Sequence, residues 1–196
     1  MLEHELDPDP LRQFSRWFDE AGAAGVRFPE TMALATASPD GRPSVRMVLL
    51  KGADERGFAF YTNRESRKGT ELAGNPRAAL VLYWQALGRQ VRVEGRVEEV
   101  GADETEAYWA TRPRGSRLSA AISPQSRVVD SRAWLEERVA ELEGADPEGP
   151  ALPAHWGGYR VVPDSIELWE HRDDRLHDRL RYTREGDSWR LERLAP

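Results

Sequence analysis

The sequence contains no cysteine. This absence excludes disulfides, thiolate catalysis, iron–sulfur clusters and cysteine zinc sites, and it is compatible with a reducing compartment. The sequence also has no run of about 18 apolar residues, so we expect no membrane-spanning helix. Its first residues are acidic and lack the apolar segment of a secretory signal. Together these absences predict a cytoplasmic protein that makes no use of thiol chemistry.

Common catalytic and metal-binding signatures are missing as well. The four histidines have no metal-ligand spacing, and neither GxSxG, a P-loop nor GxGxxG occurs. The net charge of -6 and the pI of about 5.4 argue against a general nucleic-acid binder. The sequence therefore predicts neither a metal site nor a nucleic-acid partner.

Lysine is scarce, because only Lys51 and Lys68 accompany 26 arginines. A general preference for arginine explains the scarcity but not why lysine remains at these two positions. Lysine supplies a compact point charge that arginine does not replace at a tight site. On composition alone, a site role and an ordinary surface role are both open for each lysine.

The chain of 196 residues is 39% hydrophobic, which is enough for one folded core. Antiparallel strands with short turns, interrupted by three or four helices, predict a closed or split barrel with helices outside. A loop rich in proline and glycine at 144–153 could be a domain linker. The strands predicted after it need a sheet to join, so we expect a single domain over 1–196. The predicted strands are 31–37, 44–51, 57–62, 78–84, 89–97, 156–162, 165–170, 179–184 and 188–194, and the predicted helices are 10–22, 66–73, 103–112 and 131–142.

A first polar cluster combines Arg46 on a predicted strand with Thr62, Arg67 and Lys68 near a predicted helix start. Arg46 shares a strand face with apolar residues, so it needs an anionic partner or a path to water. A helix N-terminus with adjacent cations and a hydroxyl is suited to phosphate. The alternative is ordinary surface charge behind a serine N-cap at Ser66.

A second cluster contains Tyr108, Arg112 and Ser116. The first two are four residues apart and share a helical face, and the serine follows after Pro113. A phenol, a guanidinium and a hydroxyl that converge form a second anion-binding geometry. The alternative is a helix with a buried tyrosine and a solvated arginine.

A third cluster follows Trp169. In an extended strand, alternation would place Arg175, His177 and Arg179 on one face. Such a row of potential cations repels unless an anion or an aromatic ring system lies against it. The alternative is a hairpin edge protected by charge. The pair Gly157-Gly158 is predicted to form a tight bend between strands.

Taken in chain order, nine short strings resemble the pyridoxamine 5′-phosphate oxidase family, which uses FMN. The resemblance extends from about Asp9 to the C-terminus. Its strings are RMVLLK at 46–51, FYTN at 60–63, SRK at 66–68, RQV at 89–91, RP at 112–113, QS at 125–126, WGG at 156–158, RLHDR at 175–179 and RLAP at 193–196.

The resemblance implies a mainly β fold, a split Greek-key barrel with flanking helices. It also implies a homodimer with two FMN at the subunit interface, each contacted by both subunits. The residues it implies for FMN are Arg46, Met47, Val48, Leu49, Lys51, Tyr61, Thr62, Arg67, Lys68, Gln90, Gln125, Ser126, Trp169 and Arg179. The residues it implies for the substrate are Lys51, Tyr108, Arg112, Ser116, Arg175 and His177, of which the last two would be catalytic.

The reaction it implies is oxidation of pyridoxamine 5′-phosphate and pyridoxine 5′-phosphate to pyridoxal 5′-phosphate, with dioxygen giving hydrogen peroxide. One alternative is a phenazine-pathway FMN oxidase of the same superfamily, and another is a non-catalytic split-barrel protein that binds flavin or vitamer. The run at 170–174 departs from the glutamine and glycines usual in the family, and Glu170 is expected to disturb a flavin contact.

Overall fold

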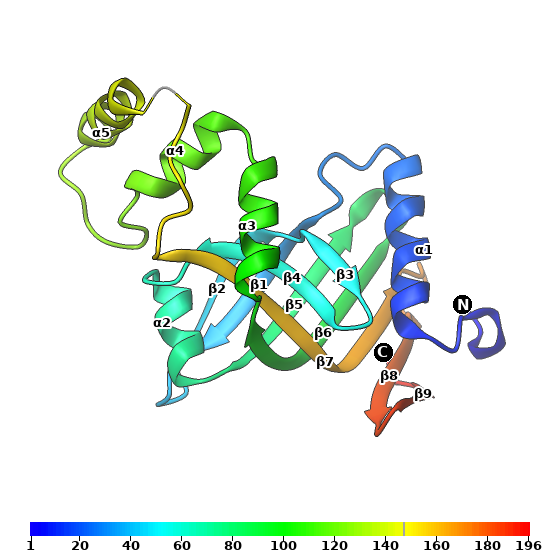
Figure 1. Cartoon of the computed structure of the whole chain (residues 1–196). Coiled ribbons are helices and arrows are strands. Elements are labelled where there is room, and N and C mark those ends of the chain that lie inside the picture. The colour runs from blue at the N-terminus through cyan, green and yellow to red at the C-terminus, as the bar shows by residue number, and fades with distance from the viewer. Residues whose placement is uncertain (147) are drawn as a thin grey trace.

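The computed structural model describes residues 1–146 and 148–196, and one antiparallel sheet dominates it (Figure 1). Its strands are β1 (Thr31–Ala37), β2 (Pro43–Leu49), β3 (Gly52–Asp54), β4 (Gly57–Asn63), β5 (Arg77–Trp84), β6 (Arg89–Glu99), β7 (Trp156–Glu170), β8 (Asp178–Glu185) and β9 (Ser188–Arg193). The helices are α1 (Pro10–Ala23), α2 (Arg67–Gly74), α3 (Ala102–Thr111), α4 (Arg114–Ile122) and α5 (Arg132–Ala145), with short 3-10 turns η1 (Glu3–Glu5) and η2 (Gln85–Leu87).

The longest strand, β7, joins the parts of the sheet. The strand order is β2-β1-β5-β6-β7-β4-β3, with β8 and then β9 added from β7. The first half of β7 pairs with β4, its second half pairs with β8, and β6 lies along most of its other edge. The sheet curls until β2 approaches β4, with the helices outside it, so the predicted split barrel is confirmed (Figure 1).

The core fills the inside of this curled sheet. Alternate residues of β1 and β6 point inward, and Leu34 and Val93 are fully buried. Helix α1 closes the barrel with Phe14, whose ring meets Phe58 edge to face at 4.9 Å between centroids. Burial of one such aromatic side chain contributes about 1.5–3 kcal/mol, so α1 adds substantially to stability. The helix starts where the sequence predicts, since the Asp9 side chain accepts a hydrogen bond from the N-terminal turn.

Most predicted elements are confirmed within one or two residues, but three predictions are wrong. The strands predicted at 156–162 and 165–170 are one continuous strand, β7. The Gly157-Gly158 pair forms no bend and lies inside that strand. A Cβ at 157 would meet the guanidinium of Arg64, and one at 158 would lie 2.7 Å from the ring of Tyr61. Glycine at these two positions therefore allows the side chains of Arg64 and Tyr61 to pack directly against the strand backbone.

The third error concerns the segment before β8. Arg175 and His177 lie in the turn between β7 and β8, and Arg175 has a left-handed backbone with φ of 66°. Alternation along a strand therefore does not apply to them. Two elements were also missed, namely β3 and α4. Helix α4 follows Pro113 directly, and the proline that ends α3 occupies the N-cap of the next helix. Among the described residues, no helix is both long and apolar enough to cross a bilayer.

Gly69 provides a test of the packing beneath α2. A Cβ at Gly69 would lie 2.0 Å from the backbone oxygen of Arg64, so the backbone itself must shift. We expect Gly69→Ala to lower the free energy of unfolding by about 1–3 kcal/mol, measured by urea denaturation. The matched control is Gly22→Ala in α1, where a Cβ meets nothing within 4 Å and helix propensity favours alanine. Equal effects of the two substitutions would contradict the close contact.

Candidate functional site

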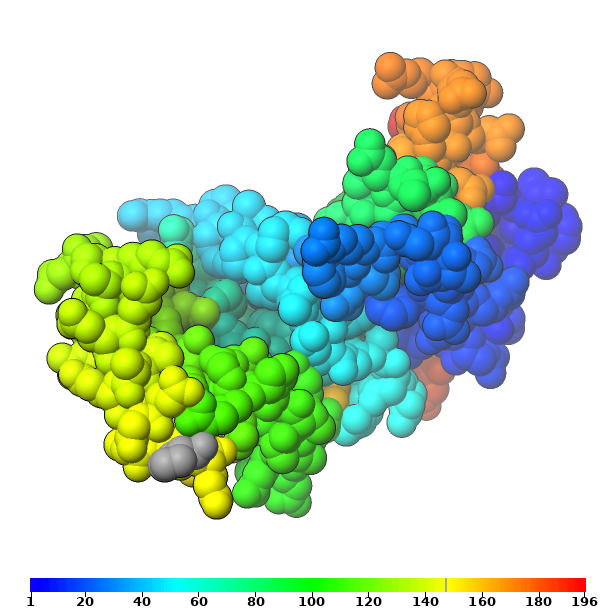
Figure 2. All heavy atoms as spheres, turned by 90° about the horizontal axis from the view of Figure 1, so that it is seen from above, coloured from blue at the N-terminus to red at the C-terminus, as the bar shows by residue number. Residues whose placement is uncertain are grey.

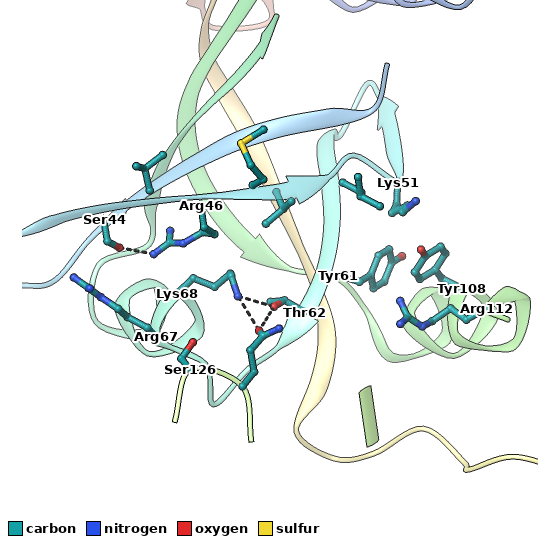
Figure 3. A pocket seen from close by; sticks show the side chains of 15 residues that line it. Ser44, Arg46, Lys51, Tyr61, Thr62, Arg67, Lys68, Tyr108, Arg112 and Ser126 are labelled. Atoms are coloured by element: carbon teal, nitrogen blue, oxygen red, sulfur yellow. Dashed lines mark hydrogen bonds between the residues drawn. The ribbon is translucent and has the colours of Figure 1, made fainter. Parts of the chain in front are cut away.

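A cavity of about 550 Å³ opens between β2, β4, α2 and α3 (Figure 3). In the space-filling view the surface is hollowed between the blue-to-cyan strands and the green-to-yellow segments that include α3 to α5 (Figure 2). Its polar side chains gather at two ends. One end holds Arg46, Arg67 and Lys68, and the other holds Lys51, Tyr108 and Arg112 (Figure 3).

At the first end, Lys68 lies in the first turn of α2 and is only 7% exposed. Its Nζ donates to Thr62 Oγ1 at 3.0 Å, to Ser66 Oγ at 3.2 Å and to Gln125 Oε1 at 2.8 Å. Burial and then the nearby charge of Arg46 lower the pKa of Lys68 to about 8. Keeping Lys68 protonated here therefore costs free energy, and an anion in the cavity would reduce that cost.

Two arginines flank this lysine. Arg46 projects from β2 toward the cavity, and its guanidinium donates to Thr36 Oγ1 at 2.6 Å and to the Leu34 carbonyl at 3.2 Å. Arg67 opens α2, where Ser66 caps the helix as predicted by accepting from Gly69 N. Three cations thus surround a helix N-terminus, which is an arrangement suited to a phosphate.

The second end is aromatic as well as cationic. The rings of Tyr61 and Tyr108 stack at 4.1 Å between centroids and 20° between planes, and Trp156 lies parallel to both. Arg112 places its guanidinium 4.8 Å from the Trp156 ring centroid and donates to the Ser116 carbonyl at 3.0 Å. The Nε of Arg112 is buried and has no hydrogen-bond partner among the described residues. The cationic and hydroxyl groups at this end are donors of the kind that an anion uses.

The first end also contains Gln125 and Ser126 (Figure 3). Gln125 Oε1 also accepts from Thr62 Oγ1 at 2.9 Å, so the loop after α4 is tied to both β4 and α2. Ser126 has φ of 73°, an uncommon backbone conformation for a residue other than glycine. Such strain persists only where surrounding contacts impose it, and it concentrates at functional sites.

Most predicted site residues thus lie in one place. The cavity is lined by Arg46, Met47, Val48, Leu49, Lys51, Tyr61, Thr62, Arg67, Lys68, Tyr108, Arg112, Gln125 and Ser126. Ser116 lines an adjoining cavity of about 500 Å³, which shares Tyr61, Thr62, Arg112 and Gln125 with the first. Both lysines of the chain border the same cavity.

Five predicted residues reach neither cavity within the chain. Gln90, Trp169 and Arg179 are cross-strand neighbours on β6, β7 and β8. His177 lies against Trp169 with 4.7 Å between ring centroids, and Arg175 is exposed in the same turn. The orange segment that contains this turn projects from the end of the molecule away from α4 and α5 (Figure 2).

Two buried residues were missed by the sequence reasoning, namely Trp156, which borders the adjoining cavity, and Glu71. Glu71 lies on α2 beneath the arginines, is 5% exposed and pairs with Arg46 and Arg67. Its spacing of four residues from Arg67 was the available signal. Glu170, expected to disturb a flavin contact, accepts from Arg89 Nε at 2.9 Å.

Comparison with known proteins agrees with this geometry. Residues 18–145 match the family model described as pyridoxamine 5′-phosphate oxidase. Residues 156–196 match the model described as pyridoxine 5′-phosphate oxidase C-terminal dimerisation region. The structure thus defines a split-barrel protein with a pocket lined by cationic side chains. The chain belongs to the pyridoxamine 5′-phosphate oxidase family, so the predicted resemblance is confirmed.

Two relatives named pyridoxine/pyridoxamine 5′-phosphate oxidase match nearly the whole chain. The one from Burkholderia lata is 55% identical over 99% of this chain and 92% of its own length. The one from Rubrobacter xylanophilus is 57% identical over 100% of this chain and 91% of its own length. These identities support an oxidoreductase of this family.

Two solved structures share the fold. PhzG from Burkholderia lata, in complex with tetrahydrophenazine-1-carboxylic acid, has a TM-score of 0.93 at 35% identity and covers 97% of this chain and 94% of its own. A pyridoxamine 5′-phosphate oxidase-related, FMN binding protein from Nostoc punctiforme has a TM-score of 0.76 at 18% identity. It covers 97% of this chain and all of its own, and its likeness shows the fold alone.

The lowered pKa of Lys68 predicts how stability depends on pH. In the ligand-free protein the buried ammonium is disfavoured, so the folded state releases the proton near pH 8 and the unfolded chain near 10.5. Stability therefore rises with pH across that window. We expect the free energy of unfolding of Lys68→Met to exceed that of the wild type by about 1–3 kcal/mol at pH 7. We expect this difference to become smaller as the pH rises from 8 to 10.5. Urea denaturation at each pH measures it. A difference independent of pH would contradict the buried ammonium.

Proposed function

We propose that this chain is an FMN-dependent oxidase that converts pyridoxamine 5′-phosphate and pyridoxine 5′-phosphate to pyridoxal 5′-phosphate. One observation carries the proposal: a single cavity has a cationic group at each end with aromatic and apolar walls between them. Such a cavity suits a phosphorylated cofactor and a phosphorylated substrate side by side. The relatives at 55–57% identity support the same assignment.

The residues of the first end fit the phosphate of FMN. Arg46, Arg67 and Lys68 would hold that phosphate at the start of α2, because a dianion satisfies all three cations. Tyr61 and Thr62, together with the β2 segment 47–49, would line the rest of the cofactor. FMN, when bound, supplies the ring system that accepts a hydride and is reoxidised by dioxygen.

The second end fits the substrate phosphate. Lys51, Tyr108, Arg112 and Ser116 offer an ammonium, a phenol, a guanidinium and a hydroxyl, which are the donors that a phosphate monoester uses. This set would hold the substrate so that its reacting carbon faces the cofactor.

The remaining residues would come from a second copy of the chain. Trp156, which borders the adjoining cavity, and Trp169 stand 13 residues apart on β7, so roughly 40 Å of strand separates them. No small ligand spans that length within one chain. We propose a homodimer in which Gln90, Trp169 and Arg179 of one subunit complete the flavin pocket of the other. The match of 156–196 to a dimerisation region supports it, and the whole chain, 1–196, would act as one unit.

In that arrangement Arg175 and His177 would lie over the substrate ring. Arg175 would stabilise charge that develops at the reacting carbon, and His177 would orient the ring through a hydrogen bond. With pyridoxine 5′-phosphate, two electrons and two protons pass to dioxygen and give hydrogen peroxide. With pyridoxamine 5′-phosphate, water also enters and ammonia leaves.

The second candidate is a phenazine-pathway oxidase. The likeness to PhzG, with its TM-score of 0.93, is the observation that favours it. A tricyclic carboxylic acid carries no phosphate monoester, so it makes no use of the complete donor set at Lys51, Tyr108, Arg112 and Ser116. The presence of that set across two adjoining cavities that share Arg112 favours the phosphorylated substrate.

Anaerobic reduction tests the proposed function. The purified protein is expected to be yellow, to release FMN on denaturation and to bleach when pyridoxine 5′-phosphate is added without dioxygen. Light scattering is expected to give about twice the chain mass of 22.2 kDa. Bleaching by tetrahydrophenazine-1-carboxylic acid but not by pyridoxine 5′-phosphate would favour the second candidate. Bound FMN that no substrate reduces would indicate a non-catalytic binding protein.

Arg112→Ala is expected to weaken substrate binding at the second end of the cavity far more than FMN binding at the first end. A charge-assisted hydrogen bond contributes about 1.5–3 kcal/mol, so KM for pyridoxine 5′-phosphate is expected to rise roughly ten- to a hundredfold. The Kd for FMN is expected to change less than about threefold. Arg117→Ala, in α4 and outside both cavities, is the control. Equal loss of FMN and substrate affinity would show that Arg112 is structural.

Arg175→Leu and His177→Asn test the third cluster. If the two residues position the substrate, Arg175→Leu lowers kcat by about tenfold or more, and His177→Asn mainly raises KM. The flavin spectrum is expected to stay unchanged in both variants. Peroxide formation with each vitamer is the assay. Wild-type kinetics in the Arg175 variant would favour a turn that only protects the edge of the sheet.

A further inference from the structure

Glu71 occupies the centre of a buried polar network that lies behind the cavity wall. Its carboxylate accepts from Arg67 Nε at 2.8 Å and from Arg46 at 3.1 Å. It also accepts from the hydroxyls of Thr36 and Ser44. Glu71 thereby connects α2 to β1 and β2, and all of its partners are on the cofactor side of the cavity.

The network determines the direction of Arg46. The same guanidinium that pairs with Glu71 also donates to Thr36 and Ser44, so it is held on several sides. In Figure 3 the Arg46 and Arg67 guanidiniums and Ser44 gather at one end of the cavity. Without a shared anion, two neighbouring guanidiniums would repel and turn toward solvent.

The network is also electrostatically matched to a phosphate. Although burial tends to raise the pKa of Glu71, its four hydrogen bonds lower the pKa to about 2, so the carboxylate is ionised. One negative charge therefore accompanies the positive charges of Arg46, Arg67 and Lys68. While Lys68 is protonated, the group has a net charge of +2, which balances a phosphate dianion.

From this arrangement we propose that Glu71 is a positioning residue that orients Arg46 and Arg67 for the phosphate of the cofactor. Glu71 does not line the cavity, so it acts through the two arginines. Its effect is therefore specific to ligands that carry the phosphate. This inference rests on the proposed function, because the anion it serves is the FMN phosphate.

Flavin binding to the flavin-free protein tests the proposal, with FMN and riboflavin compared in parallel by fluorescence quenching. Riboflavin has the same ring and side chain but no phosphate. For Glu71→Gln, we expect the Kd for FMN to rise about tenfold or more and the Kd for riboflavin to change less than twofold. Glu98→Gln, which removes an exposed carboxylate paired with Arg96 on β6, is the control and is expected to change neither value.

A double-mutant cycle separates orientation of Arg46 from a general effect of charge. If Glu71 acts largely through Arg46, Glu71→Gln raises the Kd for FMN by a smaller factor in an Arg46→Met background than in the wild type. Where Glu71→Gln does not fold, Thr36→Val removes one hydroxyl from the same network, outside the cavity, and is expected to raise the FMN Kd about threefold without affecting riboflavin.

The possible outcomes test the positioning role of Glu71 separately from the proposed oxidase function. Equal weakening of FMN and riboflavin, or unchanged or tighter FMN binding, in Glu71→Gln would overturn the positioning role while leaving the proposed function intact. Wild-type protein that binds neither flavin would overturn the proposed function, and the positioning role with it.

Discussion

Strand β7 is the constraint on which the rest of the structure depends. It is continuous over 15 residues and pairs with β4, β6 and β8, so it joins the branches of the sheet through one continuous element. Trp156 at its start packs against Arg112 of the cationic pocket, and Trp169 near its end contacts His177 in the separate aromatic and cationic cluster. A strand cannot shorten without losing its ladder of hydrogen bonds. The two clusters therefore stay apart in one chain, and the proposed homodimer is the arrangement that would bring them together.

Local sequence signals predicted much of this arrangement because they depend on neighbours in the chain. Alternation identified the inward faces of the strands, and Asp9 and Ser66 marked helix starts that the structure confirms. The same alternation placed Arg46 on an apolar face, where a cation needs an anionic partner. That partner is Glu71, which lies 25 residues further along the chain, and periodicity contains no information about such a distant pairing.

The errors have a common cause, which is that tertiary contacts override local signals. Gly157 and Gly158 indicated a bend, but the side chains of Arg64 and Tyr61 occupy the space that a Cβ would need. Alternation through Arg175 assumed extended backbone, whereas its φ is 66°. The family resemblance identified Arg175 and Ser126 as site residues without reference to their conformation. Both have left-handed backbone, with φ of 66° and 73°, and sequence periodicity does not predict such a conformation.

The pocket also shows where part of the binding free energy of an anion would come from. A lysine whose pKa is lowered to about 8 is charged at neutral pH at a cost that the ligand-free chain bears. The buried Nε of Arg112 bears a similar cost at the other end, since no described residue accepts from it. A dianion at the first end would restore the ordinary preference of Lys68 for its charged form. The ligand-free protein is therefore less stable than it would be without this buried charge. A dianionic ligand such as a phosphate would recover most of that stability.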